Sequence, residues 1–123
     1  MIPYGRHYLN REDLKTVKKV LNSDYLTQGP IVKKFENDLA RYCKSKFCST
    51  VSSASVALYL ACRSLDLKKN DIFWTVPNTY AATANAGLLC GAKIDFVDID
   101  QSTNNISLEL LKEKLKIAKK RKI

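Results

Sequence analysis

The sequence has no long hydrophobic run, and this excludes a membrane-spanning helix. Its longest stretch of small and apolar residues covers residues 54–62, well short of the ~18 consecutive apolar residues that a bilayer requires. Residues 1–5 (MIPYG) likewise lack the apolar centre of a signal peptide. We therefore expect a cytoplasmic protein that does not interact with membranes.

Metal-binding and disulfide patterns are also missing. The cysteines at positions 43, 48, 62 and 90 form no C-x-x-C pair, and His7 is the only histidine. A structural zinc site needs several such ligands at close spacing. We expect no metal site and four reduced cysteines, most of them buried.

The positive charge is concentrated at one end of the chain. Residues 112–123 contain seven basic residues and one acidic residue, so they carry +6 of the total charge of +9. Such a segment is either a solvated helix end, where lysines complement the helix dipole, or an arm that binds nucleic acid. No aromatic residue lies among these cations, as single-strand binding requires. We favour the solvated helix end and expect no nucleic-acid partner.

The first 45 residues have the pattern of two helices joined by a loop. Asn10 is placed to cap a helix that ends near Ser23, because apolar residues recur at helical spacing after it. Residues 23–30 have no periodicity, and Pro30 suits the first turn of a second helix. We predict a helix, a loop and a second helix.

The rest of the chain alternates between strand-like and helical patterns. This alternation predicts an α/β fold with parallel strands. The predicted strands cover residues 47–51, 72–76 and 94–97, and the predicted helices cover residues 54–65, 79–90 and 108–120.

Two polar segments follow predicted strands, where open α/β sheets bind their ligands. Residues 52–55 (SSAS) lead from a strand into a helix, whose free N–H groups could bind a phosphate. The alternative is that one serine only caps the helix. Tyr80 follows the next strand and could cover a flat heterocycle, or it could be an ordinary packing residue.

In their order and spacing, the segments resemble the DegT/DnrJ/EryC1/StrS family of sugar aminotransferases, which use pyridoxal 5′-phosphate. Within it, they are most similar to the transaminases of UDP-linked 4-amino-4,6-dideoxyhexoses in the pseudaminic acid pathway. The resemblance rests on residues 2–5 (IPYG), 26–30 (LTQGP), 52–55 (SSAS), 77–85 (PNTYAATAN), 90–92 (CGA) and 95–100 (DFVDID).

The resemblance implies a fold and a function. The fold would be the N-terminal part of the large domain of the aspartate-aminotransferase-like fold (fold type I), with an incomplete sheet. Residues 1–45 would form N-terminal helices and a substrate-side loop, and residues 46–123 the α/β half that binds the cofactor phosphate. The whole enzyme would move an amino group from glutamate to C4 of a UDP-4-keto-6-deoxy-N-acetylhexosamine, and it would be a homodimer.

The resemblance also implies roles for single residues. Ala54 and Ser55 would bind the cofactor phosphate through a backbone N–H and a hydroxyl; the family more often has threonine at position 55, but serine keeps the hydroxyl. Tyr80 would stack on the pyridine ring. The residues expected to face the nucleotide sugar are Tyr4, Thr27, Gln28 and Gly29.

The family's catalytic motifs do not occur in this sequence. Family members are considerably longer, and their later part supplies the Schiff-base lysine and the aspartate that pairs with the pyridine nitrogen. Transamination needs both groups. We therefore expect an N-terminal fragment that has no catalytic residue and is inactive alone. The alternatives are a non-catalytic partner subunit and a polyanion-binding module, which the charge distribution disfavours.

Overall fold

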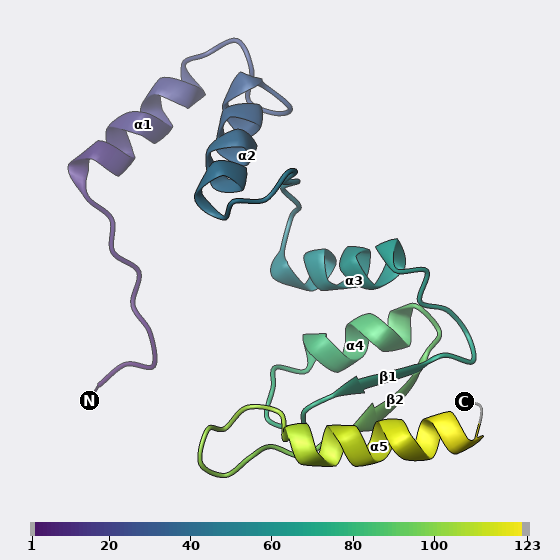
Figure 1. Ribbon diagram of the computed structural model, residues 1–123. Coiled ribbons are helices and arrows are strands. Elements are labelled where there is room, and N and C mark those ends of the chain that lie inside the picture. Colours follow the sequence, from purple (N-terminus) through teal and green to yellow (C-terminus); the bar gives the residue numbers. More distant parts are fainter. Residues whose placement is uncertain (1, 122–123) are drawn as a thin grey trace. The chain divides into compact units, whose positions relative to one another are not determined.

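The computed structural model describes residues 2–121. The chain divides into two units: an N-terminal unit that ends at Thr50 and a C-terminal unit that begins at Val51. In Figure 1 the N-terminal unit contains helices α1 and α2, and the C-terminal unit contains the remaining helices and both strands.

The first helix of the N-terminal unit, α1 (Arg11–Leu21), begins where the sequence predicts. The Asn10 side chain accepts hydrogen bonds from the N–H groups of Glu12 (2.8 Å) and Asp13 (3.1 Å). The Asp13 carboxylate in turn accepts from the N–H of Asn10 at 2.9 Å. This capping box occupies three donors that would otherwise lack partners, and it confirms Asn10 as the N-cap.

The second helix, α2 (Pro30–Tyr42), has Pro30 in its first turn, as predicted. Gly29 is its N-cap, and a Cβ atom on Gly29 would lie only 2.6 Å from the Cβ of Tyr25. The loop before α2 therefore folds back so closely on itself that only glycine fits at this position.

The strand predicted at residues 47–51 does not form. A strand needs a neighbour for its backbone groups, and none of the residues that the structure describes pairs with this segment. Instead, Glu36 of α2 holds the end of the N-terminal unit: its Oε1 accepts from the Thr50 N–H at 2.9 Å and from the Thr50 hydroxyl at 3.0 Å. These two bonds, the backbone one first, lower the pKa of Glu36.

The C-terminal unit has the predicted α/β character. Its strands β1 (Ile72–Thr75) and β2 (Lys93–Phe96) are parallel, with Ile72 opposite Lys93 and Thr75 opposite Phe96. Two of the three predicted strands are thus confirmed, within a residue at each end. The helices are α3 (Ala54–Ser64), α4 (Ala82–Leu89), which begins three residues later than predicted, and α5 (Leu108–Arg121).

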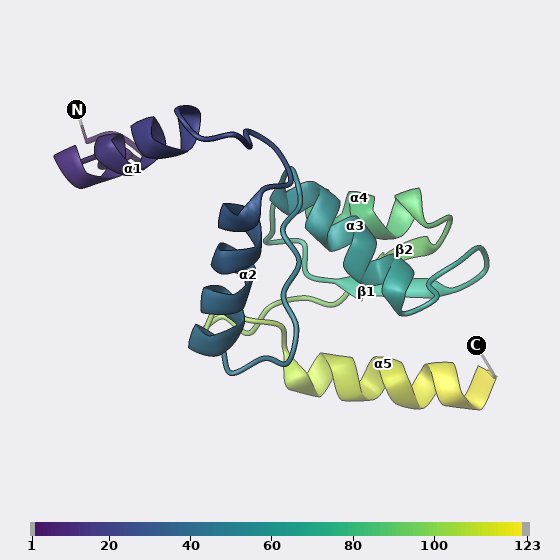
Figure 2. The ribbon, with the colours of Figure 1, turned by 90° about the horizontal axis from the view of Figure 1, so that it is seen from above.

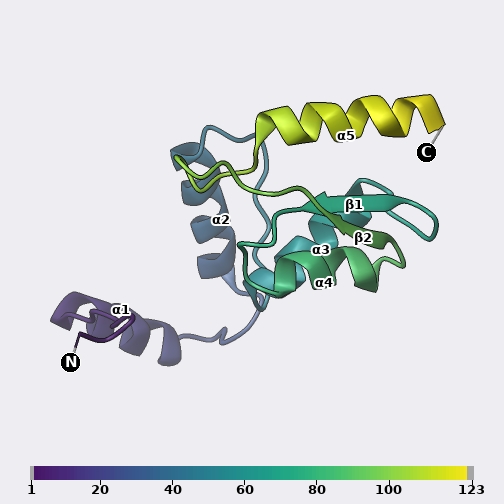
Figure 3. The same cartoon turned by 90° about the horizontal axis from the view of Figure 1, so that it is seen from below.

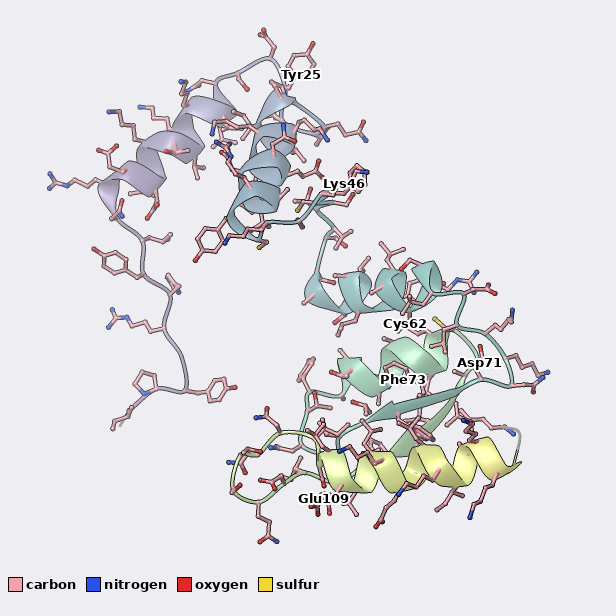
Figure 4. All side chains as sticks on the ribbon, in the orientation of Figure 1. Tyr25, Lys46, Cys62, Asp71, Phe73 and Glu109 are labelled. Carbon is pink, nitrogen blue, oxygen red and sulfur yellow. The ribbon has the colours of Figure 1, made fainter. Side chains whose placement is uncertain are left out.

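Helices cover both faces of this small sheet. Helices α3 and α4 lie together on one face and α5 lies on the other (Figures 1, 2 and 3). Phe73 and Ile94, opposite each other in the sheet, pack against Gly87 of α4 (Figure 4 labels Phe73), where a Cβ would lie 2.7–2.9 Å from their side chains. The next pair, Trp74 and Asp95, faces α5, because side chains alternate along a strand.

The connection from β2 to α5 is held by Asp100. One of its carboxylate oxygens accepts hydrogen bonds from the N–H groups of Ser102 and Thr103 and from both hydroxyls. These bonds, that of the Ser102 hydroxyl first, lower the pKa of Asp100. Asp100 therefore has a structural role in this loop.

Among the residues whose burial the structure describes, the buried ones all lie in the C-terminal unit. They are Thr75, Ala86, Gly87, Cys90, Ala92 and Val97. Within residues 2–50, by contrast, no residue is buried. Large apolar side chains such as Phe35 (55% exposed) and Leu26 (67%) remain largely accessible to solvent.

The cysteines are less buried than we expected. Cys90, at the end of α4, is buried, but Cys43 is exposed and Cys48 and Cys62 are partly exposed. The expectation of mostly buried thiols was wrong, because the core is confined to the small α4 interface. All four are free thiols.

No helix in the described residues is long and apolar enough to cross a bilayer.

Candidate cofactor site

The start of α3 presents hydrogen-bond donors that have no partner. Ser53 is the N-cap: its Oγ accepts from the N–H of Val56 at 3.3 Å, and its carbonyl accepts from the N–H of Ala57 at 3.0 Å. Among the residues that the structure describes, the N–H groups of Ala54 and Ser55 and the Ser55 hydroxyl donate to nothing. The capping explanation thus holds for Ser53 and leaves Ser55 available.

The turn before α4 places Tyr80 at the surface. The N–H of Thr79 donates to the Pro77 carbonyl at 3.0 Å, and the N–H of Thr83 donates to the Tyr80 carbonyl at 2.9 Å. Tyr80 therefore stands just before the helix, with 80% of its surface exposed. Tyr80 therefore does not pack in the core of the described part of the chain, and its ring is accessible to a ligand.

A pocket of about 310 Å³ brings Ser55 and Tyr80 together. Both strands end, and α3 and α4 both begin, on the same side of the C-terminal unit (Figure 1). This is the side on which open α/β sheets bind ligands. The pocket is lined by Ser55, Tyr80, Ala81, Ala82, Asn85, Ala86 and Leu89.

The pocket also contains Asn85, which our sequence reasoning missed. Residues 82, 85, 86 and 89 lie on one face of α4 at helical spacing, and residue 81 is the N-cap of this helix. Asn85 is the only one of these five whose side chain can form hydrogen bonds. The helical spacing of these residues in the sequence could have identified Asn85. Ala54, in contrast, does not line the pocket.

The residues expected on the substrate side belong to the N-terminal unit. Thr27, Gln28 and Gly29 form the end of the loop before α2, and Gln28 has a positive φ of 54°. Tyr4 lies in the segment before α1, which has no regular secondary structure, and it is fully exposed. The structure therefore groups three of the four residues in one tight turn.

None of the lysines that the structure describes lies in an environment that would make it a nucleophile. A Schiff-base lysine is usually desolvated or placed beside another cation. In residues 2–121, every lysine except Lys114 is exposed, and Asp66 raises the pKa of Lys68 by hydrogen bonding to it. Lys114 contacts Asp95 on the α5 side of the sheet, away from the pocket. The same residues contain no His, Cys, Asp or Glu cluster that could hold a metal ion.

These features place the chain in the class of α/β proteins that have a pocket at the carboxyl ends of parallel strands. The sequence identifies the family within this class, because residues 7–123 match the DegT/DnrJ/EryC1/StrS aminotransferase family. The chain belongs to this family, as the resemblance predicts.

One similar curated protein is the UDP-4-amino-4,6-dideoxy-N-acetyl-beta-L-altrosamine transaminase of Campylobacter jejuni. The two are 38% identical over an alignment of 117 positions, which covers 92% of this chain and 31% of the relative. A second version of this transaminase, from another strain, is 39% identical, and this chain covers 27% of it. The chain thus spans about three-tenths of the length of these relatives.

Solved structures confirm the expected fold. The sugar aminotransferase Spr1654 of Streptococcus pneumoniae, solved in its PLP form, superposes with a TM-score of 0.86 and 28% identity, over 91% of this chain and 29% of that chain. The E. coli GDP-4-keto-6-deoxy-D-mannose-3-dehydratase with bound hydrated PLP superposes with a TM-score of 0.84 and 32% identity, over 90% and 30%.

Proposed function

We propose that this chain provides the phosphate-binding and ring-stacking part of a pyridoxal 5′-phosphate site in a nucleotide-sugar aminotransferase. The observation that carries the proposal is the pocket in which Ser55 at the start of α3 faces Tyr80 before α4. Its volume of about 310 Å³ lies at the lower end of the range typical of small-molecule sites.

The phosphate fits the start of α3. Two backbone N–H groups and the Ser55 hydroxyl lack partners within the described part of the chain, and they lie at the positive end of an 11-residue helix. Charge-assisted hydrogen bonds from such donors are stronger than those to neutral groups. Ala54 would bind through its N–H, and Ser55 through both its N–H and its hydroxyl.

The ring of the cofactor fits beside Tyr80. The exposed aromatic face offers a stacking surface, and the alanines of α4 leave room for a flat molecule. When bound, the cofactor supplies the electron sink for transamination. The residues of this chain would hold its phosphate, fix the tilt of its ring and shield one ring face from water.

The family and the name of the Campylobacter jejuni relative support a proposal for the reaction and its substrates. We propose transfer of an amino group from glutamate to C4 of a UDP-4-keto-6-deoxy-N-acetylhexosamine, in pseudaminic acid or related surface-polysaccharide synthesis in the cytoplasm. The nucleotide sugar would contact Tyr4, Thr27, Gln28 and Gly29. The lysine and the aspartate that act on the cofactor would come from polypeptide that matches the rest of the relatives' length, in a homodimer, and this chain would be inactive alone.

A non-catalytic role is the second candidate. The chain would then lend its pocket or its loop to a complete homologue. The absence of a nucleophilic lysine among residues 2–121 favours this role, because such a partner needs binding residues only. Adding the chain to a shortened homologue that lacks the region matched by residues 7–123 would separate the two roles. Restored turnover would show that this chain supplies part of the cofactor site, whereas a non-catalytic partner would act only on a complete homologue.

Pyridoxine 5′-phosphate is a suitable probe of the proposed site, because it has no aldehyde and cannot react with surface lysines. In an amide-shift titration of the full chain, we expect the N–H signals of Ala54, Ser55 and Tyr80 to move together. Ser55→Ala removes one charge-assisted bond worth ~1.5–3 kcal/mol and should weaken binding roughly tenfold to hundredfold. Ser64→Ala, at the opposite end of α3, is the matched control. Equal affinities for the two variants would contradict the proposal.

A further inference from the structure

Two cysteines lie at the interface between α3 and α4. The structure describes all eleven residues of α3, and of these only Tyr59 and Cys62 are partly covered. The two are three residues apart and share one helix face, and α4 is the element that packs on α3. Figure 4 labels Cys62 on the side of α3 toward α4. Cys90, at the end of α4, is only 8% exposed.

Both helices end on the same side of the C-terminal unit, as Figure 1 shows. The segments that follow the two helices touch there. The Leu67 N–H donates to the Cys62 carbonyl at 3.2 Å, and a Cβ on Gly91 would lie 3.5 Å from the backbone nitrogen of Lys69. Cys62 and Cys90 are therefore at the same end of the interface, the end away from the candidate cofactor pocket.

The ionisation of the Cys62 thiol depends on Cys90. Burial first, and then the neighbouring Cys90, raise the pKa of Cys62. Like charges have this effect on groups that lie close together. A raised pKa lowers the fraction of thiolate, which is the form that attacks disulfides. We therefore expect Cys62 to react slowly with oxidants.

We propose that Cys62 and Cys90 form a redox pair, in which oxidation joins the ends of α3 and α4 by a disulfide bond. The oxidant is a low-molecular-weight disulfide such as glutathione disulfide. The partly exposed Cys62, as thiolate, attacks it and releases one glutathione thiol. The Cys90 thiolate then attacks the Cys62 sulfur of the mixed disulfide and releases the second. The cysteines lose two electrons and two protons, and glutathione disulfide gains them as two thiols.

The bond closes a loop of residues 62–90, which contains β1 and the turn before α4. Such a bond stabilises a fold mainly because it restricts the unfolded chain. Oxidation therefore stabilises the C-terminal unit. The pair lies away from the pocket, so its oxidation is independent of cofactor binding.

Peptide mapping after oxidation of the full chain tests the pairing. Trypsin leaves Cys48 and Cys62 in one peptide, residues 47–63, so the variant that combines Cys43→Ser with Cys48→Ser is used. After incubation with glutathione disulfide, we expect the loss of two hydrogen atoms and a cross-link between this peptide and residues 70–93. Cross-links between two chains, or a glutathione adduct on each cysteine without a cross-link, would overturn the proposal.

The oxidation equilibrium shows whether the fold brings the two thiols together. In the same variant, we expect the equilibrium constant for oxidation by glutathione disulfide to be at least about tenfold larger in the folded chain than in the chain unfolded by urea. The matched control combines Cys62→Ser with Cys90→Ser and keeps Cys43 and Cys48, for which the two constants should be nearly equal. If the folded and unfolded constants are also equal for Cys62 and Cys90, the fold does not favour their pairing and the proposal is wrong.

Discussion

The two units of the chain are stabilised in different ways. Within residues 2–50 the N-terminal unit has no buried residue, and it is held by local interactions: the capping box of α1, the pairs of Asp38 with Lys34 and Arg41, and the Glu36–Thr50 bonds. The C-terminal unit has two paired strands and contains the buried residues that the structure describes. Exposed ion pairs stabilise weakly, with a typical contribution of ~0–1 kcal/mol, so packing must stabilise the C-terminal unit more strongly than local bonds stabilise the other.

This difference in packing determines which of the proposed site residues are held in place within this chain. Ser55 and Tyr80 lie on helix starts that the packed sheet and the contact between α3 and α4 hold in place. The loop with Thr27, Gln28 and Gly29 has no comparable support within its own unit. We infer that the phosphate half of the site is preformed in this chain and that the sugar half depends on further polypeptide.

The largest expected difference in stability between the two units comes from substitution of Gly87, where α4 packs on the sheet. In Gly87→Ala the new methyl group would overlap Phe73 and Ile94, at a cost of ~1–3 kcal/mol that the helix propensity of alanine offsets by about 1 kcal/mol. We expect the C-terminal unit to lose stability in thermal unfolding followed by Trp74 fluorescence. Gly5→Ala, where nothing lies within 4 Å, should have no effect.

A smaller effect is expected at the pocket. Tyr80→Ala should lose a stacking contact of ~0.5–1.5 kcal/mol and weaken binding of pyridoxine 5′-phosphate by up to about tenfold, whereas Tyr80→Phe should bind almost normally because the ring face makes the contact. Affinities from the amide-shift titration check the order. If Tyr80→Phe weakens binding as much as Tyr80→Ala, the Tyr80 hydroxyl rather than its ring makes the contact with the ligand.

The N-terminal unit should respond to the loss of its cap and leave the other unit unchanged. Asn10→Ala removes the acceptor for two N–H groups and should destabilise α1 by ~1 kcal/mol, or about a fivefold faster amide exchange within that helix. Exchange in β1 and β2 should stay the same. A change that spreads to the strands would show that the two units are coupled.

The smallest effect is expected from acid. Lys114, and then the Phe96 N–H, lower the pKa of Asp95 below its usual value. A carboxyl whose folded pKa is lowered stabilises the fold above its unfolded pKa, and this contribution is lost as the pH falls through the folded pKa. Trp74 emission should therefore change only below about pH 4. Asp95→Asn should remove this change, and a change that persists in the variant would assign it to another group.

The fold was predictable where local signals suffice. Asn10 and Pro30 identified both helix starts of the N-terminal unit, and the apolar run at β1 identified its strand. Residues 47–51 misled us, because their strand-like composition does not reveal whether a partner strand is present. The start of α4 was placed too early, because the turn at Thr79 and Tyr80 depends on backbone bonds that composition does not show.

The site was predictable only in part. The loop before α3 and Tyr80 could be singled out from the sequence, and the structure brings Ser55 and Tyr80 to one pocket. Asn85 was missed because a single polar residue in a helix usually indicates a solvated face. The ion pair between Lys114 and Asp95 could not be predicted from the sequence, because these residues lie far apart in the chain and meet only after α5 packs on the sheet.

The measurement that tests the cofactor assignment most directly is a nuclear Overhauser experiment on the full chain with pyridoxine 5′-phosphate. The account predicts contacts between the pyridine ring and the ring protons of Tyr80, together with contacts between the methylene group next to the phosphate and the N–H of Ser55. Contacts with tyrosines of the N-terminal unit alone, or saturable binding without any contact to Tyr80 and Ser55, would contradict it.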